Sequence, residues 1–351
     1  MGANHAADGT TGVARGRVPS GGRWVRRALI ALPVLCLTTG CGGGQSTLSP
    51  HSSAAGTISS LWWIMLVGAA IVFAIVVALL ALGLLRRRST DPAERRKITP
   101  GTGFVIALGV AFPAVVIVAL FVLTLDALPK TSPSRGKTRL QVDVVGREWF
   151  WDVSYPASGA RTANEIHIPV GVPVDIRVTS ADVIHSLWVP ELNRKIDVIP
   201  GHTNDVVFHA RKAGVFRGQC AEFCGLEHAH MALYVVAQPR GAFRQWLAGE
   251  AAPAPPPANA RLERGQQVLL GSACEYCHRI AGTNATGTIG PDLTHIASRL
   301  SLAAGTIPNG RGYLAGWILD PQHIKPGNKM PGTNLSGPDL QALLDYLGSL
   351  R

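Results

Sequence analysis

The segment from Cys220 to Met231 holds the side chains best suited to chemistry in this chain. Two thiols (Cys220, Cys224), two imidazoles (His228, His230) and the Met231 thioether lie within it. Sulfur and imidazole ligands favour copper, zinc or iron–sulfur clusters, and a methionine beside them favours copper. A mononuclear electron-transfer copper site needs only one cysteine, so the second predicts enough sulfur to bridge two copper ions. A disulfide or a structural zinc site remains the alternative, although neither explains the methionine.

A second motif, Cys-Glu-Tyr-Cys-His, occupies residues 274–278. This spacing is typical of covalent c-type haem attachment, in which Cys274 and Cys277 bond the haem and His278 binds its iron. A thioredoxin-like redox pair would need a βαβ pattern, which the surrounding sequence does not contain. The motif therefore predicts one covalently bound haem c.

The sixth ligand of that iron should lie downstream of the motif. Met330 stands in Asn328-Lys329-Met330-Pro331, which resembles the axial-methionine loop of small class I cytochromes c. His295 and His323 are the rival ligands. Because His/Met ligation raises the haem potential, Met330 would suit a high-potential electron carrier.

The N-terminal third of the chain has the features of export and membrane insertion. Residues 1–41 read as a signal peptide, and Leu37–Cys41 resembles a lipoprotein processing site with Cys41 as the lipidated residue. Ordinary cleavage nearby is the alternative. The chain has six cysteines; after two for copper and two for haem, only Cys36 and Cys41 of the export region remain. The formal net charge of +11 comes mainly from residues 1–137, so it indicates topology and disfavours nucleic-acid binding.

Two uncharged apolar stretches, residues 61–85 and 104–125, are long enough to span a bilayer, which needs roughly 20 residues. The loop between them, residues 86–103, begins with three consecutive arginines and should face the cytoplasm by the positive-inside rule. Pro113 is expected to kink the second helix. Everything after residue 126 should then lie on the outer face of a bacterial cell membrane.

Two soluble domains are expected after the membrane helices. Residues 138–247 contain short alternating apolar runs punctuated by Gly and Pro, which predict an all-β cupredoxin sandwich. Residues 249–260 form a Pro/Ala linker of extended character. Residues 261–351 should fold as a small all-α cytochrome c domain, with helical periodicity at both ends. The predicted fold class is thus a multidomain membrane protein with a two-helix transmembrane hairpin.

The sequence resembles subunit II of cytochrome c oxidase between about residues 60 and 247. The resemblance rests on His185, on Lys195–Gly201 and Gly218–Cys220, and on Gly146–Trp151. It implies a dinuclear copper A centre bridged by two thiolates and completed by imidazole, thioether and carbonyl ligands: Cys220, Cys224, His185, His228, Met231 and the backbone carbonyl of Glu222. His230 is expected at the surface.

The same resemblance assigns roles to two further side chains. The Glu222 carboxylate would help to bind magnesium at the border with subunit I. Trp149 would correspond to an exposed tryptophan through which electrons enter copper A, whereas Trp151 is expected in the core. Ordinary core packing is the alternative for Trp149.

Together these features resemble subunit II of a caa3-type oxidase with a fused cytochrome c. Such a subunit would take electrons from an external donor, a cytochrome c or cytochrome bc complex, through haem c and copper A to subunit I. Oxygen reduction and proton pumping would take place in subunit I. A copper-A nitric oxide reductase small subunit and a membrane-anchored electron shuttle are the alternatives.

Overall fold

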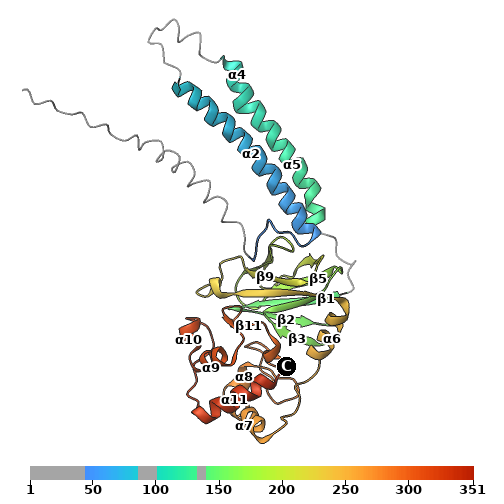
Figure 1. Ribbon diagram of the computed structural model, residues 1–351, viewed down its shortest axis with the longest axis vertical. Helices are drawn as coiled ribbons and strands as arrows, with labels where there is room; N and C mark the ends of the chain where they lie inside the picture. Colours follow the sequence, from blue (N-terminus) through green and yellow to red (C-terminus); the bar gives the residue numbers. More distant parts are fainter. Residues whose placement is uncertain (1–43, 86–100, 133–139) are drawn as a thin grey trace, which may run out of the picture. The chain divides into compact units, whose positions relative to one another are not determined.

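The computed structural model describes residues 44–85, 101–132 and 140–351 (Figure 1). The predicted signal peptide with Cys36 and Cys41, and nearly all of the predicted cytoplasmic loop, lie outside these residues. The conclusions about export, lipidation and loop orientation therefore stay predictions.

Two long apolar helical stretches precede the sheets. The first is α2 (Ser53–Leu85); the second combines α4 (Thr102–Ile106), a π-helical turn (Ala107–Ala111) and α5 (Phe112–Thr131). Both are long and apolar enough to cross a membrane, and both exceed the predicted spans. The π-helical turn directly precedes Pro113, which has no N–H to donate to the turn before it.

The β region forms two five-stranded sheets. The first has the order β3-β2-β1-β5-β8 and the second the order β4-β10-β9-β6-β7. The strands are β1 (Leu140–Arg147), β2 (Phe150–Tyr155), β3 (Ala160–Ala163), β4 (Glu165–Pro169), β5 (Val174–Ser180), β6 (His185–Trp188), β7 (Ile196–Val198), β8 (Asn204–Phe208), β9 (Gly214–Cys220) and β10 (Ala232–Gln238).

Alternation along the strands builds the core of this region. Val142 and Val144 of β1 are fully buried, as are Trp151 and Val153 of β2 and Ile176 of β5, while the residues between them are more exposed. Successive side chains of a strand point to opposite faces, so β1, β2 and β5 each bury one face against the other sheet. The predicted sandwich, with Trp151 in its core, is confirmed.

The C-terminal region is helical and has a hydrophobic core of its own. Its helices follow α6 (Arg240–Glu250) and are α7 (Ala260–Leu270), α8 (Cys274–Cys277), α9 (Arg311–Leu319), α10 (Pro321–Ile324) and α11 (Gly337–Ser349); β11 (Ser301–Leu302) and β12 (Ile307–Pro308) form a short hairpin. The side chain of Asn259 accepts from the Leu262 N–H and caps α7, and Ser336 caps α11 in the same way.

Helices α7 and α11 meet at Gly265. A methyl group at this position would overlap the Ala342 carbonyl and the Tyr346 side chain. Glycine therefore permits the close approach that packs the first and last helices of this region together.

The predicted linker does not run free of the helical region. The Ala254 N–H donates to the Ala281 carbonyl at 2.9 Å, and a His295 ring nitrogen lies 3.0 Å from the Ala252 carbonyl. These hydrogen bonds hold the segment against the region that follows it, which the proline content alone could not indicate.

Candidate metal and haem centres

Strand pairing and one loop bring the predicted copper ligands together. His185 opens β6 and Cys220 closes β9, and these antiparallel strands are neighbours through the Leu187–Cys220 pair. The loop after β9 carries Cys224 and ends at Met231, directly before β10. Two rigid strands thus place one imidazole beside a sulfur-rich loop.

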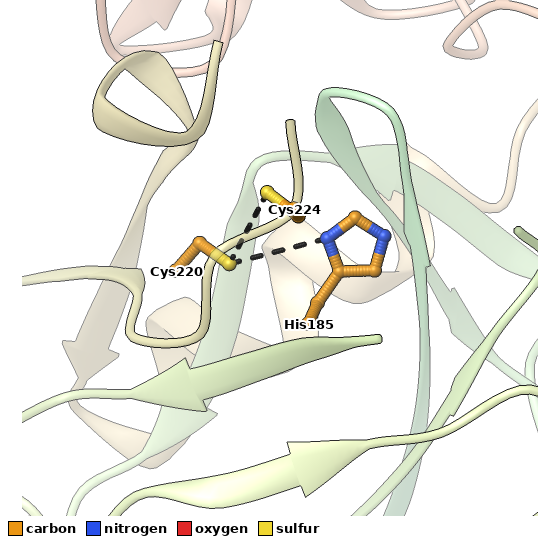
Figure 2. A group of neighbouring side chains, drawn as sticks. All are labelled: His185, Cys220 and Cys224. Atoms are coloured by element: carbon orange, nitrogen blue, oxygen red, sulfur yellow. Dashed lines mark hydrogen bonds between the residues drawn. The ribbon is translucent and has the colours of Figure 1, made fainter. Parts of the chain in front are cut away.

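The donor atoms converge on one buried point. The Cys220 and Cys224 sulfurs lie 3.7 Å apart, and His185 Nδ1 is 3.9 Å from Cys220 Sγ (Figure 2). On the other side, His228 Nδ1 and Met231 Sδ lie 3.6 and 3.9 Å from Cys224 Sγ. Both cysteines are free thiols. A set of two thiols, two imidazoles and a thioether fits copper rather than a hard, oxygen-seeking cation.

The backbone carbonyl and the side-chain carboxylate of Glu222 face different partners. Its backbone carbonyl lies 3.2 Å from Cys220 Sγ, within reach of the same centre. Its half-exposed carboxylate points to Lys195, with Oε2 3.2 Å from Nζ. The carboxylate is therefore already paired with a cationic side chain.

Asp182 orients the buried His185. The carboxylate Oδ1 lies 2.8 Å from Nε2 of His185, which is fully buried. Burial raises the pKa of Asp182, but hydrogen bonds from His185 and from the Glu148 and Val183 N–H groups outweigh it and hold this pKa below its ordinary value. An ionised Asp182 accepts the Nε2 proton and leaves the Nδ1 lone pair facing the sulfurs. Sequence reasoning missed Asp182, although its position three residues before His185 was the available signal.

The contact between the two thiols shifts their pKa values in opposite directions. The hydrogen bond from the Cys224 thiol lowers the pKa of Cys220 well below the ordinary thiol value, against the opposing effect of burial. The same contact, together with burial, raises the pKa of Cys224. The lowered pKa favours the thiolate form of Cys220, and thiolate is the form that ligates metals.

Two other predicted residues lie close to this centre. Trp149 donates from Nε1 to the Cys224 carbonyl at 2.8 Å, but only 8% of it is exposed, so the expectation of an exposed tryptophan is wrong. Its indole is held against the copper loop instead of facing solvent. His230 is exposed, as expected, and its Nδ1 pairs with Glu227 at 2.6 Å.

The haem motif borders a largely apolar pocket that opens to solvent. Cys274, His278 and Met330 all line it. His278 Nδ1 donates to the Pro291 carbonyl at 2.8 Å, which leaves the Nε2 lone pair for a metal. Burial lowers the pKa of His278, which favours the neutral, ligating imidazole. The residues present thus fit a haem held through Cys274 and Cys277.

The rival iron ligands lie elsewhere. Both ring nitrogens of His295 are 3.0 Å from backbone carbonyls, those of Arg351 and Ala252. His323 is exposed in α10. Neither histidine lines the cavity, so the geometry favours Met330.

Comparison with known proteins agrees with this arrangement. Residues 158–238 match the family model "Cytochrome C oxidase subunit II, periplasmic domain", and residues 262–351 match "Cytochrome c". Cytochrome c oxidase subunit 2 of Alkalihalophilus pseudofirmus is 32% identical over 91% of this chain and 96% of its own length. The chain belongs to the cytochrome c oxidase subunit II family.

This subunit II chain has further relatives. The same subunit of Bacillus sp. strain PS3 is 28% identical over 76% of this chain and 80% of its own length. The crystal structure of the periplasmic domain of subunit II of cytochrome oxidase from Bradyrhizobium japonicum is 32% identical, with a TM-score of 0.32, and covers 33% of this chain and 96% of that one. As a subunit II, the chain is part of an oxidoreductase.

Proposed function

We propose that this chain is the electron-transfer subunit II of a caa3-type cytochrome c oxidase. It would accept electrons from an external cytochrome c or cytochrome bc complex and deliver them to subunit I. Oxygen would be reduced to water there, with proton pumping. Two features in one chain carry this proposal. The first is a pair of thiols 3.7 Å apart among imidazoles, and the second is an apolar pocket beside a Cys-x-x-Cys-His motif.

When bound, a copper pair and a haem c supply one-electron redox chemistry at these two places. The copper pair would be held by Cys220, Cys224, His185, His228, Met231 and the Glu222 carbonyl. The haem would be held by Cys274, Cys277, His278 and Met330. The chain's own contribution is to fix these side chains on paired strands and short helices, so that little rearrangement accompanies each change of charge.

The predicted location follows from the two apolar helices. They would anchor the chain in a bacterial cell membrane by two passes, with the copper and haem regions on the outer face. The Glu222 carboxylate would bind magnesium at the boundary with subunit I in exchange for its pairing with Lys195. Subunit I and other oxidase subunits are the expected permanent partners.

The test is purification of the native complex from membranes. We expect two copper ions that share one unpaired electron in electron paramagnetic resonance, one covalent haem, and a large partner that turns over oxygen. A single isolated copper signal contradicts the copper A assignment. Turnover of nitric oxide instead of oxygen would identify a nitric oxide reductase, and purification without a large partner would identify an electron shuttle.

A further inference from the structure

Lys325 is a lysine of the helical region whose ammonium group is buried against the copper region. Only 3% of the residue is exposed. Its Nζ lies 2.8 Å from the Trp149 carbonyl and 2.7 Å from the His230 carbonyl, with the Ala303 carbonyl at 3.4 Å. Lysines are almost never fully buried unless their charge is satisfied. Burial lowers the pKa of Lys325 to about 8, and Glu227 and Cys224 oppose this shift.

The segment that carries Lys325 also carries the candidate iron ligand. The Gln322 side chain donates to the Met330 carbonyl at 2.9 Å, which fixes the end of this short loop to α10. At the middle of the loop, Gly327 adopts a positive φ of 84° and lies directly against the Leu226 side chain of the copper loop. One loop therefore contacts both the haem cavity and the copper loop.

Hydrogen bonds continue from Lys325 to a predicted copper ligand. Lys325 donates to the backbone carbonyl of Trp149, and the indole of the same tryptophan donates to the Cys224 carbonyl. Trp149 thus connects Lys325 to Cys224 through two hydrogen bonds, one at its backbone carbonyl and one at its indole. Lys325 itself lies five positions before Met330 in the sequence.

Two other contacts join the helical region to the copper region near this lysine. Lys329 pairs with Glu148 at 3.0 Å, but its side chain is more than half exposed, so the pair adds little in water. The Ala232 N–H, at the start of β10, donates to the Ala304 carbonyl at 2.9 Å. Of these three contacts, the Lys325 contact is the one in which a buried charge depends on acceptors from the copper region.

We propose that Lys325 is the positioning residue that fixes the haem region on the copper loop and thereby sets the rate of electron transfer between the two centres. This inference rests on the proposed function. Its physical basis is that the packed arrangement takes the Trp149 carbonyl out of water and partly shields that of His230, so both lose their donor when the ammonium group is removed. The contact therefore selects one arrangement of the two regions.

The test compares Lys325→Met, Lys329→Met and Lys212→Met in the full-length chain within its complex. Lys212 is exposed in a turn of the sandwich and provides the matched control. Hydrogen exchange of the peptide that contains Ala232 reports whether the Ala304 contact stays closed. Flash-induced electron transfer from haem to copper reports the rate, and the haem and copper spectra report whether each centre is intact.

We expect Lys325→Met to speed exchange at Ala232 and to slow internal electron transfer, each by about tenfold or more, with both spectra unchanged. Lys329→Met should change either quantity by less than about threefold, as an exposed ion pair does, and Lys212→Met should change neither. If Lys325→Met does not accumulate as a folded chain, Lys325→Gln, which keeps a shorter donor, serves in its place.

Wild-type exchange and wild-type electron transfer in the Lys325 variant would overturn the proposal. So would a slower rate accompanied by an altered copper spectrum, since the lysine would then act by shaping the copper site. Failure of the proposed function is a separate result, because the unmodified complex would then lack the haem or copper signals altogether.

Discussion

Replacing Asp182 with asparagine tests how the copper ligand His185 is held. Asp182 uses both carboxylate oxygens: Oδ1 faces His185 Nε2 at 2.8 Å and Oδ2 accepts from the Glu148 N–H at 2.8 Å. Asparagine has only one oxygen, so its NH₂ group must face one of these two donors. Either way, a part-buried N–H loses its acceptor, which costs about 1 kcal/mol or more, up to the roughly 3 kcal/mol of a fully buried group.

The expected consequence is weaker copper binding in a chain that still folds. Loss of a carboxylate behind a metal-binding histidine commonly lowers metal affinity by about 10–100-fold. The NH₂ orientation that faces Glu148 keeps His185 in place and gives the low end of this range; the opposite orientation gives the high end. Asp143→Asn is the matched control, because Asp143 lies on the half-exposed face of β1 and pairs with Arg177.

Copper affinity would be measured by competition with a chelator in the purified full-length chain, with paramagnetic resonance to identify the bound form. Equal affinities in the Asp182→Asn and wild-type chains would refute the reasoning, since they would mean that strand geometry alone orients His185. A loss of affinity in Asp143→Asn as large as that in Asp182→Asn would assign the effect to charge at a distance.

Two further substitutions test the helical region. Gly265→Ala should lower the free energy of unfolding by about 1–3 kcal/mol, because the added methyl group overlaps Ala342. The control Gly348→Ala, in open space on α11, should be neutral or slightly stabilising. Thermal melts followed by haem absorbance compare the two variants, and equal melting temperatures would contradict the packing argument. Met330→Ala should leave the haem attached but lower its reduction potential, whereas His323→Ala should leave the potential unchanged. Potentiometric titration measures both potentials, and an unchanged potential in Met330→Ala would exclude Met330 as the ligand.

Much of the architecture could be predicted because its signals are local. The alternation in β1 and β2, the apolar stretches and the Cys-x-x-Cys-His spacing each depend on residues close in sequence. The cysteines, His228 and Met231 also lie in one loop. The role of His185 as a ligand follows from family resemblance. Its place beside Cys220 depends on which strands pair, and no local sequence pattern encodes that pairing.

The contacts between regions could not be predicted for the same reason. Lys325 looks like any loop lysine in the sequence, since only the fold brings the carbonyls of Trp149 and His230 to its ammonium group. The Pro/Ala linker reads as a free tether because composition describes the unbound chain and omits the hydrogen bonds that it finds after folding. The burial of Trp149 likewise depends on a contact between regions, since its carbonyl accepts from Lys325.

The burial of Trp149 bears on where an external donor can act. With 8% of the residue exposed, its carbonyl bonded to Lys325 and its indole bonded to Cys224, this tryptophan has little surface left for a diffusing protein. At the haem motif, by contrast, Tyr276 is 72% exposed between the two attachment cysteines. A donor that approaches this chain therefore meets accessible surface beside the haem cavity and little at the tryptophan.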